Sequence, residues 1–358
     1  MTRLLSARTV APVAGLLLVL VGATGCASVG AETFDARGEV SLLRADVPLR
    51  EPTWVSHENV LLTLAADEPR VVKLDPGAET PAGEAQASQP NEGAVLASEE
   101  LESAGENLAT YERKPGQAYL PQPDLGRVAV MDVANLNVEE TLELGNAPPY
   151  EVATQPNSDT LFTLSRDGST VTAFDLERDE VVDEVRAEAG EGAMLEAPEK
   201  GLYPSFWLAD RDGVSFYHGD PAPMRRLTGE RIGANDIAVD HESSQRAYVA
   251  EAGTGRVVAL EGDPEGLLEG ELLEVAERDL GEEVRHVETT TTEVYAATEN
   301  ELFVMRREDL SVEETVDFRA PLGDEALKRA PVSGMAVGKE KVYLTLEGQP
   351  YVVSVDKP

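Results

Sequence analysis

Residues 160–175, TLFTLSRDGSTVTAFD, decide the fold of this chain. Two runs rich in β-branched and aromatic residues flank a short turn sequence, Arg166-Asp167-Gly168, and the second run ends at Asp175. Such a pair of runs around a glycine-containing turn predicts an antiparallel hairpin.

The hairpin recurs along the chain. Its second run ends at Asp75, Asp132, Asp175, His218, Glu261, Arg306 and Asp356, so the successive spacings are 57, 43, 43, 43, 45 and 50 residues. Eleven to thirteen positions earlier, each unit has a large apolar residue: Leu62, Tyr119, Phe162, Phe206, Tyr248, Tyr295 or Tyr343. A period of 40 to 50 residues is typical of propellers and other repeat arrays.

Each unit also has room for one strand before the hairpin, as at 150–153 and 236–239, and one after it, as at 139–144 and 312–318. Four antiparallel strands form a propeller blade, and blades that stack around an axis bury one another's apolar faces. The last unit stops after its third strand, and an extra strand-like run, 39–44, precedes the first unit.

We therefore predict an all-β fold over residues 38–358: a seven-bladed β-propeller of four-stranded blades whose ring is closed by this N-terminal strand. An open solenoid or a two-domain β protein is the alternative, and it leaves the extra strand unused.

Two segments interrupt the period. Residues 76–110 are rich in Ala, Gly, Pro and Glu and poor in large apolar residues, a composition that predicts a mobile acidic insertion. Residues 320–332 are a shorter insertion before the last blade.

The N-terminus has the pattern of a targeting signal. Arg3 and Arg8 are followed by an apolar run, 11–21, and by the small residues 22–25. The tetrapeptide 23–26 (ATGC) resembles a bacterial lipobox, although Ala23 stands where leucine is commonest. That resemblance implies a signal peptide over 1–25, lipidation of Cys26, a tether over 26–37, and anchoring to the outer face of the bacterial cytoplasmic membrane. An ordinary secreted protein cleaved nearby is the alternative.

The chain is strongly acidic: 67 Asp and Glu against 30 Lys and Arg give a net charge of −37. This charge repels nucleic acid and anionic lipid headgroups, so we expect no nucleic-acid partner. The acidic composition has three possible explanations: it keeps the protein soluble, it adapts the protein to a salty medium, or it attracts cations. Cys26 is the single cysteine, so no intramolecular disulfide can form.

Blades three and five resemble a known repeat. The segments 147–157, 161–164 and 168–175, and again 237–240, 247–250 and 255–260, are similar to the YVTN-type, WD40-like propeller repeat over roughly residues 115–310. The resemblance implies a propeller outside the cytoplasm. It implies no single activity, because such propellers include binding proteins, surface-layer proteins, lactonases and metallochaperones.

In a propeller, the loops that lead into the inner strands surround one mouth of a central channel. We expect the ligand-binding residues there to be Trp54, Tyr150, Glu151, Asn235, Asp236, Arg285, His286 and Ser333. A hydrated channel with ordinary polar linings is the alternative.

The sequence gives little support for a metal site or a cofactor site. The four histidines, His57, His218, His241 and His286, fall in different units with no HxH or HxxxH pair, and no calcium-loop, phosphate-loop or dinucleotide motif occurs. We therefore expect no metal and no cofactor.

These observations favour a monomeric, non-catalytic binding or scaffold lipoprotein of the cell envelope that recognises a small solute, a cation or an envelope protein. The alternative is a lactonase-like hydrolase in which His286 or Glu151 acts as the base beside Arg285. Metal delivery to a transporter is a third reading, from which the absence of a histidine cluster departs.

Overall fold

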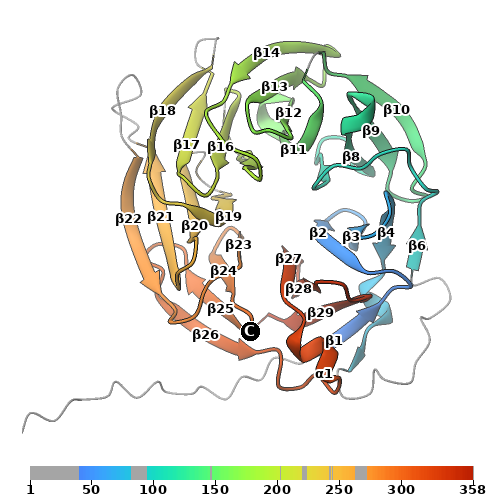
Figure 1. Ribbon diagram of the computed structural model, residues 1–358, viewed down its shortest axis with the longest axis vertical. Coiled ribbons are helices and arrows are strands. Elements are labelled where there is room, and N and C mark those ends of the chain that lie inside the picture. The colour runs from blue at the N-terminus through green and yellow to red at the C-terminus, as the bar shows by residue number, and fades with distance from the viewer. Residues whose placement is uncertain are drawn as a thin grey trace, which may run out of the picture. The chain divides into compact units, whose positions relative to one another are not determined.

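A computed structural model describes residues 40–81, 95–145, 147–201, 203–219, 224–241, 243, 245–262 and 272–357. Seven antiparallel sheets surround a common axis as a seven-bladed β-propeller (Figure 1). The sequence-based prediction of the fold class is confirmed.

Six blades have four strands each, from the channel outward. Blade 1 contains β2 (Leu49–Val55), β3 (Val60–Ala65), β4 (Val71–Leu74) and β6 (Val95–Ala97); blade 2 contains β7 (Ala109–Thr110), β8 (Gln117–Gln122), β9 (Arg127–Asp132) and β10 (Val138–Glu143); blade 3 contains β11 (Pro149–Gln155), β12 (Thr160–Ser165), β13 (Thr170–Asp175) and β14 (Glu180–Arg186). Blade 4 contains β15 (Met194–Glu196), β16 (Ser205–Ala209), β17 (Val214–His218) and β18 (Arg225–Glu230); blade 5 contains β19 (Ala234–Val239), β20 (Arg246–Glu251), β21 (Arg256–Gly262) and β22 (Leu272–Asp279); blade 6 contains β23 (His286–Thr289), β24 (Glu293–Ala297), β25 (Glu301–Arg306) and β26 (Val312–Asp317).

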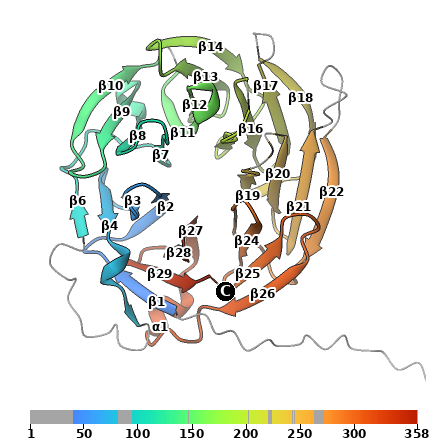
Figure 2. The ribbon, with the colours of Figure 1, turned by 180° about the vertical axis from the view of Figure 1, so that it is seen from behind.

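Blade 7 combines both ends of the propeller. Its sheet order is β27 (Val332–Val337), β28 (Lys341–Leu346), β29 (Tyr351–Asp356), β1 (Val40–Arg44) and β5 (Thr80–Pro81). The N-terminal strand β1 pairs antiparallel with β29, with Val40 opposite Val355 and Leu43 opposite Val352. Both views show the blue β1 beside the red β29 (Figures 1 and 2). The predicted closure of the ring by this strand is confirmed.

The repeated large apolar residues form the core between blades. The side chains that recur on the second strand of each blade are almost wholly inaccessible to solvent: Leu62, Tyr119, Phe162, Phe206, Tyr248, Tyr295 and Tyr343. Each lies in an apolar cluster shared with a neighbouring blade. Burial of these faces supplies the hydrophobic stabilisation that a single sheet lacks.

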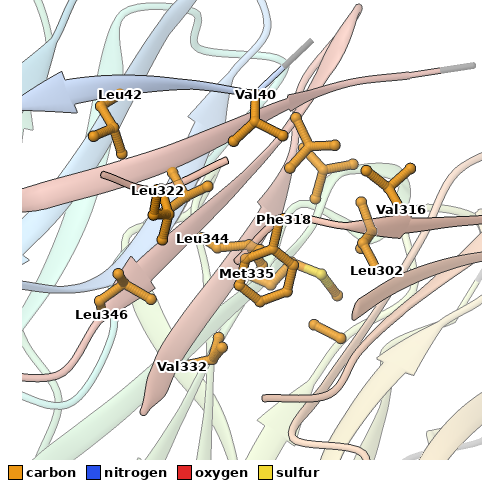
Figure 3. Packing of buried hydrophobic residues seen from close by; sticks show 14 of the residues in the cluster. Val40, Leu42, Leu302, Val316, Phe318, Leu322, Val332, Met335, Leu344 and Leu346 are labelled. Carbon is orange, nitrogen blue, oxygen red and sulfur yellow. The ribbon is translucent and has the colours of Figure 1, made fainter. Parts of the chain in front are cut away.

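The cluster at the closure is drawn from blades 6 and 7. Val40 and Leu42 of β1 pack with Phe318, Leu344 and other residues (Figure 3). Leu42 retains only 3% of its accessible surface. The N-terminal strand therefore contributes apolar burial to the closure in addition to its backbone hydrogen bonds.

Part of the segment predicted as an insertion belongs to the blades. Residues 95–97 form the outer strand of blade 1 and residues 109–110 the inner strand of blade 2. Residues 76–81 form a 3₁₀ turn, η1 (Pro76–Ala78), and strand β5. The low apolar content obscured these elements because β6 is largely exposed and β5 and β7 have two residues each. Residues 82–94 lie outside the described residues.

A strap from blade 1 crosses the closure. Strand β5 pairs with β1, so the strap adds a fifth strand to blade 7. The carboxylate of Glu79 accepts a hydrogen bond of 2.8 Å from Ser354 Oγ and binds Lys341 Nζ, which also lies 3.1 Å from Asp356 Oδ1. First and last blades are thus joined by two strands and by this polar cluster.

The predicted insertion at 320–332 is packed against the core. It contains the short helix α1 (Glu325–Arg329), whose Leu327 joins the closure cluster together with Leu322. The guanidinium of Arg319 donates hydrogen bonds to the carbonyl oxygens of Leu327 and Ala330. Two further 3₁₀ turns, η2 (Pro123–Leu125) and η3 (Pro156–Ser158), connect strands within blades 2 and 3.

No helix among the described residues is long and apolar enough to cross a membrane. The predicted signal peptide, Cys26 and the tether lie outside the described residues, which begin at Val40.

Candidate functional site

The inner strands of four blades are irregular near their starts. The pairing with the second strand shifts between Pro149 and Glu151 in blade 3 and between Ala234 and Asp236 in blade 5. Blades 1 and 7 show corresponding shifts in β2 and β27. A β-bulge re-aims the side chains around it, so Tyr150 with Glu151, and Asn235 with Asp236, both lie at the channel.

Just after these irregularities, side chains of one blade bind the backbone of the next. Glu151 accepts a hydrogen bond of 2.8 Å from Leu195 N, and Asp236 accepts one of 3.0 Å from Val287 N. Asn107 accepts one of 2.9 Å from Val152 N. The equivalent positions on the inner strands of six blades are called the first ring: Asn107, Glu151, Met194, Asp236, His286 and Gly334. All of them except Gly334 line the channel.

Two residues further along each inner strand lies a second ring. Its members are Ala109, Ala153, Glu196, Ala238, Glu288 and Ala336, and all six line the channel. Four blades thus carry alanine where blades 4 and 6 carry glutamate. Glu196 and Glu288 flank the blade that contributes Ala238.

The channel is a cavity of about 980 Å³. Its lining contains Glu51, Glu106, Glu151, Glu191, Glu196, Glu199, Asp236 and Glu288. Arg166, His241 and His286 are the cationic or potentially cationic residues of the same lining. Carboxylates therefore dominate the electrostatics of the cavity.

Burial and mutual repulsion disfavour ionisation of the carboxyl groups. Burial raises the pKa of Glu51 to about 7, an effect opposed by His286, and it raises the pKa of Glu288 to about 7 with the help of Asp236. Burial also raises the pKa of Glu196 well above its ordinary value, and repulsion from Glu288 adds to this. Near neutral pH, these sites gain from a nearby positive charge.

Several carboxyl groups of the lining, among them Glu51 and Glu196, have no hydrogen-bond or ion-pair partner among the described residues. The side chains of Glu51 and Glu196 are partly buried, and both line the channel. Among the described residues, neither carboxyl group forms a hydrogen bond within the protein or an ion pair. Their acceptor oxygens are available to whatever enters the channel.

The two histidines of the channel favour the charged form. Nδ1 of His241 lies 3.0 Å from Glu199 Oε1, and Nε2 lies 3.0 Å from the carbonyl oxygen of Thr289. Because both nitrogens face acceptors, the hydrogen bond with Glu199 raises the pKa of His241. Burial opposes the charge of His286, but Asp236 Oδ2, 3.2 Å from its Nδ1, raises the pKa above the ordinary value.

The structure brings together six of the eight mouth residues that the sequence predicts. Those that line the channel are Trp54, Tyr150, Glu151, Asn235, Asp236 and His286. Tyr150 donates a hydrogen bond to Glu106, and Trp54 stacks on Tyr343 with ring centroids 5.5 Å apart. The amide of Asn235 donates to the carbonyl oxygen of Val284 at 2.8 Å, which joins blades 5 and 6.

Arg285 and Ser333 are placed elsewhere. Neither is part of the channel lining. The guanidinium of Arg285 lies 2.9 Å from Glu299 and 3.1 Å from Glu283, and the hydroxyl of Ser333 donates to Thr345 Oγ1 at 3.1 Å. The group suggested for a hydrolase, with Arg285 beside His286 or Glu151, is therefore not assembled around the cavity.

The carboxylates are distributed along the channel rather than gathered at one point. No three His, Cys, Asp or Glu side chains in the described part of the chain are close enough together to hold a metal ion.

Sequence reasoning missed Glu51, Glu196 and Glu288. Glu196 lies in an inner strand of only three residues, and Glu288 in one of four. Such short strands show no clear alternation. The available signal was alanine at the equivalent position of the other blades, which marks both glutamates as exceptions once the blades are aligned.

Comparison with known proteins supports the fold. No family model matches the sequence, and no curated protein matches it. A chain in a crystal structure of a mitotic checkpoint complex is similar with a TM-score of 0.67 and 14% identity, over 96% of this chain and 99% of that one. The structure of U3-55K is similar with a TM-score of 0.63 and 9% identity, over 89% and 98%. Both likenesses fit a WD40-like propeller; no family match supports the YVTN repeat type.

Proposed function

We propose that this protein is a non-catalytic binding propeller whose central channel takes up a small positively charged solute. The observation that carries the proposal is a cavity of about 980 Å³ whose lining holds eight carboxyl groups and one arginine. A propeller scaffold is suited to this role because its channel is formed by rigid inner strands.

Electrostatics favour a cation strongly. Carboxylates that line a partly enclosed cavity interact with a bound charge more strongly than carboxylates in open water. Because Glu51 and Glu196 lack a protein partner, a bound cation would satisfy them and relieve their repulsion with neighbouring carboxylates. The indole of Trp54 in the same lining adds an aromatic surface that suits organic cations.

The cellular location is also a proposal. The lipobox-like residues 23–26 and the preceding apolar run support an envelope protein held at the outer face of the cytoplasmic membrane through Cys26. A double or triple acyl anchor of this kind binds a membrane stably, whereas one chain binds only weakly.

The binding function can be tested by calorimetry and thermal unfolding of the propeller with solutes of similar size but different charge. Amines should bind and raise the melting temperature beyond the effect of sodium chloride at equal ionic strength, whereas dicarboxylates should do neither. Glu288→Gln should weaken binding, and the matched control Glu139→Gln, on the exposed outer strand β10, should not. Equal binding of anions and cations would show the proposal to be wrong.

A further inference from the structure

A loop of blade 4 reaches beyond the two blades that adjoin it. Residues 197–201 follow the inner strand β15, and Glu199 among them lines the central channel. Glu199 also lines a smaller cavity of about 130 Å³, together with Trp54 of blade 1, Thr110 of blade 2 and Thr154 of blade 3. Blades 1 and 2 do not adjoin blade 4 in the ring (Figure 1). The loop therefore extends over the channel.

The loop crosses the channel at the end where the inner strands finish. Thr110 is the last residue of β7, and Thr154 lies one residue before the end of β11. His241 follows β19 by two residues, and Thr289 is the last residue of β23. The first ring lies nearer the starts of the inner strands, so loop 197–201 is at the other end of the channel.

The loop is anchored at both ends. Before it, the backbone N–H of Leu195 donates a hydrogen bond of 2.8 Å to Glu151. After it, the backbone N–H of Ser205 donates one of 2.9 Å to the side-chain oxygen of Gln155. Leu195 and Ser205 are each 1% exposed. Because both anchors are buried, any opening of the loop is confined to the residues between them.

The middle of the loop is held by a histidine that joins three blades. Nδ1 of His241 in blade 5 lies 3.0 Å from Glu199 Oε1 in blade 4, and its Nε2 lies 3.0 Å from the carbonyl oxygen of Thr289 in blade 6. Only the charged imidazole has an N–H on both nitrogens. Either neutral tautomer places a nitrogen lone pair against one of these oxygens, so the contact with Glu199 depends on the proton of His241.

The charged groups around this histidine favour its charged form. The hydrogen bond with Glu199 raises the pKa of His241 above the ordinary value of 6.5, burial opposes the rise, and Glu288 of β23 adds to it. His57 and Glu112 share the small cavity with Glu199. Because the folded state holds the proton of His241 more tightly, its contribution is complete below pH 6.5 and is lost as the pH rises through the raised value.

We propose that residues 197–201 form a gate at this end of the channel, closed by the contact of Glu199 with charged His241 and released when His241 loses its proton. The two anchors stay in place on release, so the loop moves aside without unfolding of the blade. The gate controls access to the channel whatever the channel binds. It therefore goes beyond the proposed function, and its tests need no ligand.

The fluorescence of Trp54 reports the state of the gate, because this side chain lines both cavities together with Glu199. The other tryptophan, Trp207, is 0% exposed. Quenching by acrylamide therefore measures access to Trp54. We expect the quenching constant of the folded propeller to rise at least about twofold between about pH 6 and about pH 9, as the loop opens locally. Trp54→Phe should leave weak quenching that does not change with pH.

Two substitutions test the contact from its two sides. His241→Gln removes the titrating group, and Glu199→Gln removes the carboxylate while keeping the size of the side chain. Both variants should show at about pH 6 the strong quenching that the unsubstituted protein shows only at about pH 9. His57→Gln is the matched control, since His57 is an exposed histidine of the same small cavity. It should preserve the pH dependence.

Three results would overturn the gate. Quenching of the unsubstituted protein that stays constant over this pH range would show that the loop does not open. A pH dependence that persists in His241→Gln, or that disappears in His57→Gln, would assign the titration to another group. An equal rise of quenching in Trp54→Phe would show that the whole propeller loosens.

Discussion

The carboxyl group of Glu151 in blade 3 accepts a hydrogen bond of 2.8 Å from the backbone N–H of Leu195 in blade 4. Glu151 is 7% exposed and Leu195 is 1% exposed. The same side chain faces the channel. One carboxyl group therefore both joins neighbouring blades and contributes to the potential of the cavity.

Replacement of Glu151 should separate these roles. Glu151→Ala leaves the buried N–H of Leu195 without a partner and should lower the free energy of unfolding by about 1–3 kcal/mol. Glu151→Gln keeps an acceptor oxygen and should cost clearly less. Urea unfolding followed by circular dichroism measures both. Equal destabilisation by the two variants would show that the hydrogen bond is unimportant.

Stability should fall as the pH rises through neutrality. The pKa values of Glu51 and Glu288 are raised from 4.5 to about 7, so the folded state binds more protons than the unfolded state in this range. Their stabilising effect is complete below pH 4.5 and is lost as the pH rises through about 7. His286, with its pKa also raised, acts in the same direction.

Thermal unfolding in low-salt buffers at a series of pH values measures this slope. Glu288→Gln should flatten it, because glutamine does not titrate, and Glu139→Gln should leave it unchanged. A melting temperature that rises steadily from mildly acidic to mildly alkaline pH would contradict the assignment.

The closure of the ring should depend on strand β1. Leu42→Ala removes a side chain that is 3% exposed within the closure cluster and should destabilise the propeller by about 2–5 kcal/mol. The matched control is Leu273→Ala on outer strand β22, where the side chain is 51% exposed; its effect should stay within about 0.5 kcal/mol. Similar losses for the two variants would argue against a closure through β1.

Binding of an amine should release protons near pH 7. A bound ammonium group favours the charged form of neighbouring carboxyl groups and lowers their pKa. Because Glu51 and Glu288 have pKa values of about 7, they are partly protonated at that pH before binding. Calorimetry in buffers of different ionisation enthalpy counts the protons, and uptake instead of release would contradict this linkage.

The anchor can be tested in cells. Cys26→Ser removes the only thiol available for acylation, so the protein should move from the membrane fraction to the medium. Immunoblots of the two fractions measure this. Retention of the variant in the membrane fraction would refute lipidation at this position.

The fold was predictable because the repeated large apolar residues have one physical role in every blade. Tyr119, Phe162 and Tyr248 are each fully buried between sheets, and a recurring need for burial leaves a recurring pattern. The extra strand β1 was predictable by the same logic, since the last unit lacked an outer strand.

The site was predictable only in part. Positions at the starts of inner strands could be inferred from the period, which located Glu151, Asp236 and His286 at the channel. The direction of the side chains could not be inferred, because a β-bulge changes it locally. Tyr150 lines the channel, whereas Ser333, at the corresponding shift in blade 7, donates a hydrogen bond to Thr345. The guanidinium of Arg285 forms ion pairs with Glu283 and Glu299 and does not line the channel.

The pairing of β1 with β29 affects the order of events during biosynthesis. A chain delivered N-terminus first, from a ribosome or through a translocation pore, presents β1 long before its partner has emerged. Val40 can pair with Val355 only after the end of the chain has emerged, and Glu79 of the strap can accept the hydrogen bond of Ser354 only then as well. Contacts this distant in sequence slow folding, so the finished ring assembles only after the final strand has been delivered.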